Sequence, residues 1–209
     1  MTLHYQFIDG DRTLSPLLLL HGNGGTERDL LPIGQFIAPD APRLAIRGRE
    51  IEQGETRYFR HLPDGTIDFA NLDTETTWLL NTAAALTRKY QLFASRMIVA
   101  GYSNGGNLAI RAMMSRPLPY RTVLLFHAKP LGPLDHPKLS PRTLVWASYG
   151  THDPIVSQAE FATLQAQIQT AGGELTTFSH DEQHNLNLSE LQAAKRWLAQ
   201  SGRLKEESL

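Results

Sequence analysis

The chain has 209 residues, which suits one globular domain with a substantial buried core. Its 20 lysine and arginine residues nearly balance 21 aspartate and glutamate residues, so its charge favours neither a nucleic-acid partner nor an anionic membrane surface. It contains no cysteine, which excludes a disulfide framework, a cysteine nucleophile and a thiolate metal site.

The start of the chain has no basic segment followed by an apolar stretch, so we expect no secretory signal peptide. The longest apolar run, Leu17–Leu20, is far too short to span a bilayer. These features predict a cytoplasmic protein without stable membrane insertion.

The N-terminal part of the chain predicts short strands and one helix. His4–Ile8 predicts a first strand, and the fully apolar run Leu17–Leu20 predicts a buried central strand. Apolar residues at helical spacing predict a helix over Asp29–Ala38, and Arg43–Ile46 predicts the next strand.

The segment Arg47–Asn71 is polar, glycine-bearing and irregular, and we predict a long surface loop there. Long loops in compact domains are often functional. Arg57, Tyr58 and Phe59 lie in this loop and form a candidate substrate-binding rim for an aromatic or anionic acyl group. Simple packing of the loop explains the same residues equally well.

Strands and helices alternate through the rest of the chain. The predicted elements are a helix over Asp73–Tyr90, a strand over Met97–Ala100, a helix over Asn104–Ser115, strands over Thr122–Phe126 and Thr143–Ser148, a helix over Ser157–Ala171, a strand over Glu174–Ser179 and a helix over Ser189–Ser201. This order predicts a mostly parallel sheet with helices on both faces. No linker or repeat divides the chain, so we predict a single domain over residues 1–209.

A Gly-x-Ser-x-Gly motif lies at residues 101–105, between a predicted strand and a predicted helix. A sharp strand-to-helix turn would expose Ser103 Oγ, and Gly101 and Gly105 would allow the close backbone contacts that such a turn requires. The amino end of the following helix would stabilise a developing oxyanion. An ordinary turn with a capping serine is the alternative. The setting predicts Ser103 as a nucleophile.

A serine nucleophile needs a general base, and that base needs an orienting acid. With this type of turn, the acid and then the histidine follow the serine in the chain. Asp153 follows an apolar strand and a short turn, which would place it at the carboxyl edge of the sheet. Asp135 and Asp181 are expected to be exposed. We therefore predict Asp153 as the acid.

Two histidines, His180 and His184, follow Asp153. His180 ends a predicted strand, whereas His184 lies in the loop before the last helix and can reach over the sheet edge, so we favour His184 as the base. The pair superficially resembles the His-Glu-x-x-His helix of zinc peptidases. Position 181 is aspartate rather than glutamate, and the segment joins a strand to a loop, so no metal site is predicted.

A glycine-rich segment at residues 22–25 follows the predicted strand Leu17–Leu20. Serine hydrolases with this nucleophile turn take one oxyanion donor from the residue after the serine and another from a loop after an early strand. These donors would be the backbone N–H groups of Asn104 and Asn23, with His21 supporting the loop. A phosphate-binding loop is disfavoured because no Gly-Lys-Ser/Thr follows.

Taken together, these segments resemble the phospholipase/carboxylesterase family, and within it small bacterial hydrolases linked to hydroquinone and quinone stress. The resemblance covers roughly residues 15 to 200. The matching segments are Leu-His-Gly-Asn-Gly-Gly at 20–25, Arg-Gly at 47–48, Arg-Tyr-Phe-Arg at 57–60, Gly-Tyr-Ser-Asn-Gly at 101–105, Gly-Thr-His-Asp-Pro-Ile at 150–155 and the histidine at 184. Many family members carry glycine where this chain has Gln183.

The resemblance implies an α/β-hydrolase fold, with Ser103, Asp153 and His184 as the catalytic triad and with Asn23 and Asn104 as oxyanion donors. A single domain of this length leaves no room for a large cap domain. The predicted reaction is carboxylic ester hydrolysis through an acyl-enzyme, without a metal or organic cofactor.

The predicted partner is a small-molecule ester substrate, and a homodimer is left open. Lysophospholipase and acyl thioesterase activities are alternatives within the same chemistry. A ligand-binding protein that has this fold but no catalytic activity is the alternative from another class.

Overall fold

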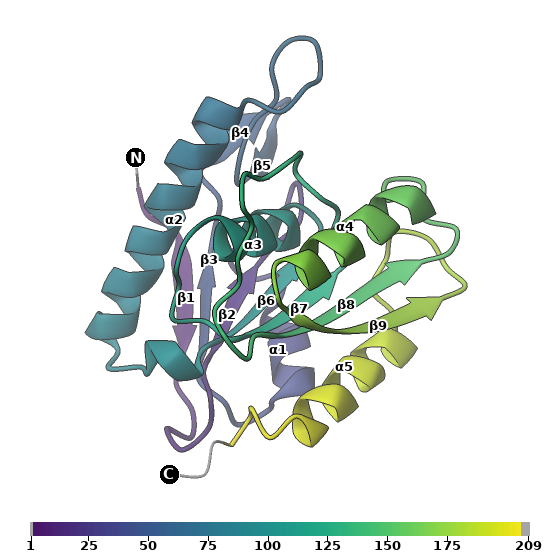
Figure 1. Ribbon diagram of the computed structural model, residues 1–209. Coiled ribbons are helices and arrows are strands. Elements are labelled where there is room, and N and C mark those ends of the chain that lie inside the picture. The colour runs from purple at the N-terminus through teal and green to yellow at the C-terminus, as the bar shows by residue number, and fades with distance from the viewer. Residues whose placement is uncertain (1, 206–209) are drawn as a thin grey trace.

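The computed structural model describes residues 2–205, and these residues share one large β-sheet (Figure 1). Its strands lie in the spatial order β1-β3-β2-β6-β7-β8-β9. Their bounds are β1 (Tyr5–Ile8), β2 (Leu17–Leu20), β3 (Arg43–Ile46), β6 (Ile98–Tyr102), β7 (Thr122–Phe126), β8 (Leu144–Gly150) and β9 (Glu174–His180). Strand β1 pairs with β3 in antiparallel register, and the other neighbouring pairs are parallel. The predicted mostly parallel sheet is confirmed.

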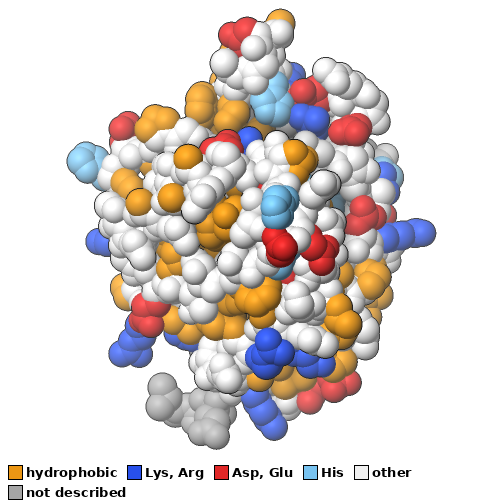
Figure 2. Space-filling model, turned by 90° about the vertical axis from the view of Figure 1, so that its right-hand side faces the viewer, with side chains coloured by type: hydrophobic (Ala, Val, Ile, Leu, Met, Phe, Trp, Pro, Cys, Tyr) orange, Lys and Arg blue, Asp and Glu red, His pale blue; other side chains and the backbone are white. Residues whose placement is uncertain are grey.

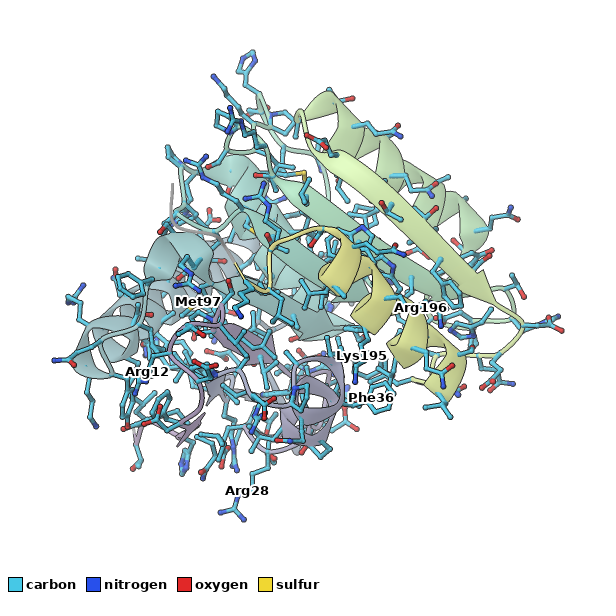
Figure 3. All side chains as sticks on the ribbon, turned by 90° about the horizontal axis from the view of Figure 1, so that it is seen from below. Arg12, Arg28, Phe36, Met97, Lys195 and Arg196 are labelled. Carbon is cyan, nitrogen blue, oxygen red and sulfur yellow. The ribbon has the colours of Figure 1, made fainter. Side chains whose placement is uncertain are left out.

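Helices cover both faces of this sheet, as predicted (Figure 1). One face is covered by α2 (Phe69–Lys89), α3 (Asn104–Ser115) and α4 (Gln158–Thr170), and the other by α1 (Leu31–Ile37) and α5 (Leu188–Gln200). The view from below shows α1 beside α5, where Lys195 Nζ lies 5.1 Å from the centre of the Phe36 ring (Figure 3). Within residues 2–205 no further domain is inserted between the strands.

The all-leucine strand β2 explains why both faces of the sheet must be covered. Side chains alternate between the two faces of a strand. Leu18 and Leu20 pack in the cluster under α2, α3 and α4, whereas Leu17 and Leu19 pack in the cluster under α1 and α5. All four are at most 2% exposed. A strand with polar residues on one face could not occupy this position.

The order of the strands places the two glycine-bearing motifs next to each other. From β2 the chain passes to β3 on one side and then returns to β6 on the other side of β2. Connections that leave in opposite directions open a crevice at the carboxyl ends of the two strands, where ligands commonly bind in such sheets. The loop at residues 21–25 follows β2, and Ser103 follows β6.

The prediction of a long surface loop over Arg47–Asn71 is wrong in part. Residues 50–57 form a small hairpin of β4 (Glu50–Glu52) and β5 (Glu55–Arg57), and α2 begins at Phe69. The three-residue strands are too short for a periodic signal. Helix α2 begins early because the Asp68 carboxylate accepts a hydrogen bond from the Asn71 N–H and caps the helix.

Several predicted elements agree with the structure residue for residue, namely the strands at 17–20, 43–46 and 122–126 and the helix at 104–115. Strands β6, β8 and β9 extend one or more residues beyond their predicted ends, toward the edge where the motifs lie. A 3₁₀ turn at Ala94–Arg96 was not predicted. No helix among the described residues is both long and apolar enough to cross a membrane.

Gly105 allows α3 to approach β2 closely. A Cβ at this position would lie 2.5 Å from the carbonyl oxygens of both Leu20 and His21, and these backbone atoms cannot move independently of the sheet. A Cβ at Gly101 would likewise lie 2.6 Å from the Gly106 Cα. The predicted need for glycine at 101 and 105 is confirmed.

We expect Gly105→Ala to lower the free energy of unfolding by more than about 2 kcal/mol, because the added methyl group overlaps fixed backbone atoms. Urea denaturation would measure the change. Gly54→Ala is the matched control, since nothing lies within 4 Å of a Cβ added there and only its positive φ of 82° opposes the change. A loss at Gly105 no larger than the loss at Gly54 would contradict the argument.

Candidate active site

Ser103 occupies a strained turn between β6 and α3. Its φ is 48° and its ψ is −116°, a conformation that residues other than glycine rarely adopt. The turn is held by hydrogen bonds from the Ser103 N–H to the Phe126 carbonyl oxygen (2.8 Å) and from the Asn107 N–H to the Ser103 carbonyl oxygen (2.8 Å). The side chain thus leaves the carboxyl end of β6 at the amino end of α3, as the motif predicts.

The structure brings Ser103, His184 and Asp153 together from three separate loops. His184 Nε2 lies 2.9 Å from Ser103 Oγ, and His184 Nδ1 lies 2.6 Å from Asp153 Oδ2. Because an ionised carboxylate only accepts hydrogen bonds, Nδ1 carries the proton and Nε2 accepts from the serine hydroxyl. The side chain of Asp153 is fully buried, while that of His184 is 10% exposed.

The surroundings of His184 favour its neutral form. Burial lowers the pKa of the imidazole, the positive charges of His127 and Lys129 lower it further, and Asp153 opposes them. The resulting pKa lies below the ordinary value. A neutral His184 can take a proton from Ser103 at neutral pH.

Tyr102, the second residue of the motif, holds the loop that carries His184. Its hydroxyl donates a hydrogen bond to the carbonyl oxygen of His184 (2.6 Å), and the two rings lie 5.4 Å apart. Burial and the charge of Asp153 raise the pKa of Tyr102 to about 12, so the phenol keeps its proton. Sequence reasoning missed this role because the motif leaves the position unspecified.

Asp153 accepts four hydrogen bonds. Oδ1 accepts from the backbone N–H groups of Ile155 (2.8 Å) and Val156 (2.9 Å), and Oδ2 accepts from His184 and from His127 Nδ1 (2.9 Å). Burial alone would raise the pKa of this carboxyl, but the hydrogen bonds outweigh burial and lower it. Asp153 is therefore ionised and its orientation is fixed.

Sequence reasoning also missed His127, which follows β7 directly. Its side chain is fully buried, and its Nε2 lies 3.3 Å from Oε1 of the fully buried Glu190 in α5. The Glu190 carboxylate also accepts a hydrogen bond from the Ser148 hydroxyl. The only available signal was a histidine at the carboxyl end of an apolar strand, the edge where catalytic groups collect in such sheets.

The predicted oxyanion donors flank the nucleophile. A Cβ at Gly22 would lie 3.5 Å from the Ser103 Cβ, so the glycine-rich loop directly adjoins the serine. Among residues 2–205 the N–H groups of Asn23 and Asn104 have no intramolecular acceptor, whereas those of Gly24 and Gly105 donate to carbonyl oxygens. Both candidate donors are thus free, and their role in catalysis stays a prediction.

His21 supports this loop, as predicted. It is 2% exposed, its Nδ1 donates to the Gly22 carbonyl oxygen (2.6 Å), and its Nε2 accepts from the Gly48 N–H (3.0 Å). Burial lowers the pKa of the ring, so it stays neutral and can make both bonds. The bonds join the glycine-rich loop to the segment after β3.

The expectation of a substrate-binding rim at Arg57, Tyr58 and Phe59 is corrected for Tyr58 and Phe59 by their burial, and for Arg57 it stays a prediction. Tyr58 is 1% exposed and Phe59 is 2% exposed, and both pack in the core under α2. The side chain of Arg57 is 12% exposed and pairs with Glu52 at 3.3 Å. The β4–β5 hairpin turns the chain back toward the sheet, and Tyr58 and Phe59, which follow β5, pack in the core there.

Tyr58 instead forms hydrogen bonds to residues on either side of Ser103. Its hydroxyl donates to the Ile46 carbonyl oxygen (2.6 Å) and accepts from the His21 N–H (3.1 Å). Its own N–H donates to Oδ1 of Asn104 (2.8 Å). Tyr58 thus connects β3 both to His21, at the start of the loop that carries Asn23, and to Asn104, the first residue of α3.

The side chains of His180 and His184 contact different partners. His180 Nε2 lies 3.7 Å from Glu190 Oε1, whereas His184 contacts Ser103 and Asp153. The pair therefore does not form the two-histidine face of a zinc-peptidase helix. Two other groups of side chains lie close enough to hold a cation, namely His127 with His180 and Glu190, and His127 with Asp153 and His184.

The strands β8 and β9 point toward the face shown in Figure 2. Acidic and histidine side chains lie next to one another near its centre, among apolar and neutral atoms. Lysine and arginine side chains lie mainly toward its margin, and no broad basic patch is seen in this view. The surface at the carboxyl ends of β8 and β9 therefore combines polar and apolar side chains.

Comparisons with known proteins show the family and the fold to which the chain is similar. A sequence model of the family described as phospholipase/carboxylesterase matches residues 69–201. The protein MhqD of Bacillus subtilis strain 168, which is named as a hydrolase, is 32% identical over 182 residues, covering 87% of this chain and 90% of MhqD.

Two solved structures extend the likeness to the whole fold. YahD, whose structure contains malic acid, is 36% identical with a TM-score of 0.91, covering 95% of this chain and 99% of YahD. A carboxylesterase of Bacillus cereus is 30% identical with a TM-score of 0.89, covering 96% of this chain and 95% of that protein. The chain therefore belongs to the phospholipase/carboxylesterase family of α/β-hydrolase-fold hydrolases.

Proposed function

We propose that this protein is a serine carboxylesterase, with Ser103 as nucleophile, His184 as general base and Asp153 as the orienting acid. The observation that carries the proposal is the continuous hydrogen-bonded chain from Ser103 Oγ through His184 to Asp153. A nucleophile within reach of a neutral base, which is itself oriented by a buried carboxylate, is the arrangement that acyl transfer requires.

In the first step Ser103 Oγ attacks the ester carbonyl carbon while His184 Nε2 takes the hydroxyl proton. The carbonyl oxygen becomes an oxyanion, which accepts hydrogen bonds from the N–H groups of Asn23 and Asn104 in this proposal; that these two groups have no intramolecular acceptor among the described residues supports it. The tetrahedral intermediate collapses, the carbon–oxygen bond to the alcohol breaks, and the alcohol leaves with the proton from His184. Ser103 then carries the acyl group.

In the second step a water molecule attacks the acyl-enzyme and His184 takes its proton. Collapse of the second tetrahedral intermediate releases the carboxylic acid and returns the proton from His184 to Ser103. The residues of this chain supply the nucleophile of the first step and the base and the oxyanion donors of both steps.

We expect Ser103→Ala to reduce ester hydrolysis at least about 10³-fold, because only transition-state binding by the oxyanion donors remains. The measurement is kcat/KM for p-nitrophenyl esters of graded chain length. Ser115→Ala, at the exposed far end of α3, is the matched control and should keep full activity. A fluorophosphonate probe should label the wild-type protein and leave folded Ser103→Ala unlabelled.

The same panel separates the alternatives. Thioesters and lysophospholipids with matched acyl chains distinguish an esterase from an acyl thioesterase or a lysophospholipase. Equal ester hydrolysis by the wild type and Ser103→Ala would refute the proposed nucleophile. A folded wild-type protein that neither hydrolyses any of these compounds nor reacts with the probe would instead be a non-catalytic binding protein.

The pKa of His184 sets the expected pH dependence. Only the neutral imidazole accepts the serine proton, so kcat/KM should fall as the pH drops through this pKa. Because the pKa of His184 is lowered, the midpoint of this fall should lie below the ordinary histidine value of about 6.5. A profile of kcat/KM against pH, with folding checked by circular dichroism at each pH, would measure it. A midpoint above about 6.5 would contradict the assignment of the base.

A further inference from the structure

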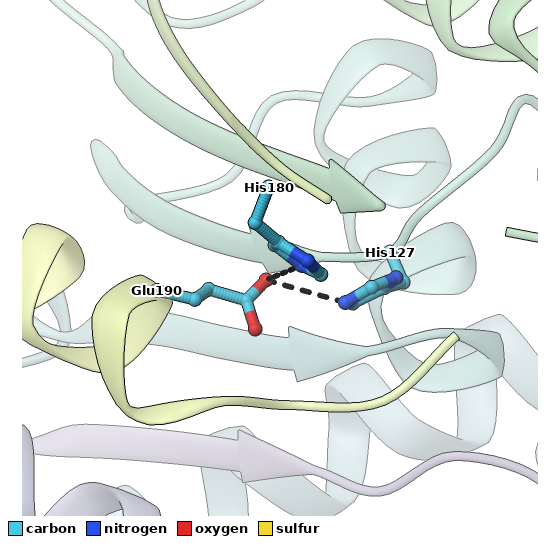
Figure 4. Close-up of side chains that lie close together, drawn as sticks. All are labelled: His127, His180 and Glu190. Atoms are coloured by element: carbon cyan, nitrogen blue, oxygen red, sulfur yellow. Dashed lines mark ion pairs between the residues drawn. The ribbon is translucent and has the colours of Figure 1, made fainter. Parts of the chain in front are cut away.

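The triad mechanism leaves a buried cluster of ionisable groups beside the site unused, namely His127, His180 and Glu190. His127 lies between two carboxylates, with Nδ1 2.9 Å from Asp153 Oδ2 and Nε2 3.3 Å from Glu190 Oε1. The side chains of His127, Asp153 and Glu190 are fully buried. Figure 4 shows Glu190 of α5 facing both His127 and His180. A buried carboxylate without a cation is strongly unfavourable, so this pair of acids needs a positive partner.

His127 has an unusual backbone conformation. Its φ is 50°, in the left-handed region, and its N–H donates to the Ser148 carbonyl oxygen (3.0 Å). A histidine in this conformation is uncommon and is usually maintained by its surroundings. The rings of His184 and His180 both lie close to the His127 ring, with ring centres 5.0 Å and 5.2 Å away.

Both ring nitrogens of His127 face carboxylate oxygens. Asp153 Oδ2 accepts from His184 as well as from His127, and Glu190 accepts from the Ser148 hydroxyl. The ionised Asp153 carboxylate offers no proton, so Nδ1 must carry its own. Nε2 makes no hydrogen bond among the described residues, but it lies within ion-pair distance of Glu190 Oε1, where a second proton on the ring would be stabilised. A histidine with protons on both nitrogens is an imidazolium.

We propose that His127 is a positioning residue of the triad, an imidazolium at neutral pH that keeps Asp153 ionised and turned toward His184. This inference rests on the proposed function, because it assigns Asp153 and His184 their roles in the triad. Burial opposes the charge, but the ion pairs with Glu190 and Asp153 outweigh burial and raise the pKa of His127.

The charge of His127 also acts on the base. It partly neutralises Asp153 and repels a proton arriving at His184, and both effects lower the pKa of His184. The groups facing His127 are Asp153, Glu190, His180, His184 and the phenol ring of Tyr102. Of these, Asp153 and Glu190 are the groups that favour a second proton on His127. The arrangement extends the activity of a serine hydrolase toward acidic pH.

His127→Asn is the informative variant. Asparagine tolerates a positive φ better than most residues, and its amide nitrogen can replace Nδ1 as a donor to Asp153 without the charge. Removing a positive charge whose ring centre lies 5.0 Å from that of His184 should raise the pKa of His184. We expect the acid midpoint of kcat/KM to move upward by about one pH unit. The plateau at high pH should fall far less than in Ser103→Ala.

His180→Asn is the matched control. His180 belongs to the same buried cluster and lies 3.7 Å from Glu190 Oε1, but among the described residues it makes no hydrogen bond or ion pair with Asp153. We expect this variant to keep the wild-type midpoint, even where its stability falls. An equal shift in both variants would mean that any disturbance of the cluster moves the profile, and it would overturn the proposal.

A direct readout uses the wild-type protein and needs no activity. We expect nitrogen-15 NMR to show protons on both ring nitrogens of His127 at pH 7, where an ordinary histidine with a pKa of about 6.5 is mostly neutral. A His127 that has only one proton at pH 7 would overturn the proposal. Metal bound by His127, His180 and Glu190 would leave Nε2 without a proton, so it would give that same contrary result.

The two proposals fail in different ways. If Ser103→Ala keeps its ester hydrolysis, the proposed function fails, whatever the state of His127. If Ser103→Ala is inactive and His127→Asn keeps the wild-type midpoint, only the role of His127 fails. Should His127→Asn not fold, the NMR result on the wild type decides the question.

Discussion

A buried negative charge at Asp153 is the constraint around which the rest of the site is arranged. A carboxylate in the protein interior is stable only when hydrogen bonds and opposite charge replace the water that it has lost. Here two backbone N–H groups and two histidine rings do so. The same hydrogen bonds that stabilise the charge fix its direction, so the orientation of His184 follows from the way in which Asp153 is stabilised.

This arrangement also gives the site its own dependence on pH. The lowered pKa of Asp153 contributes stability above the ordinary aspartate value of 3.8, and this contribution is lost as the pH falls through the lowered pKa. The raised pKa of His127 contributes stability below the ordinary histidine value of 6.5, and this contribution is lost as the pH rises through the raised pKa. Asp153 and His127 therefore both make their full contribution to stability only between pH 3.8 and pH 6.5.

The three residues of the proposed triad were easier to predict from the sequence than the residues that hold them in place. Ser103 was predictable because its motif joins a visible strand to a visible helix, and Asp153 and His184 because they follow in the required order. His127 and Glu190 carry no such pattern, since they lie 63 positions apart and meet only because α5 packs under the sheet. Tyr58 was misread because burial depends on the return of a short hairpin, which leaves no periodic signal.

The unusual backbone at Ser103 has a consequence for the evolution of stability in this chain. A side chain at a positive φ destabilises the folded state, and glycine would fit the same turn with less strain. The protein therefore keeps, at the position of the proposed nucleophile, a residue that its own fold disfavours. Selection for stability alone would replace the serine, so its presence marks a compromise between a durable fold and a hydroxyl group held at this turn.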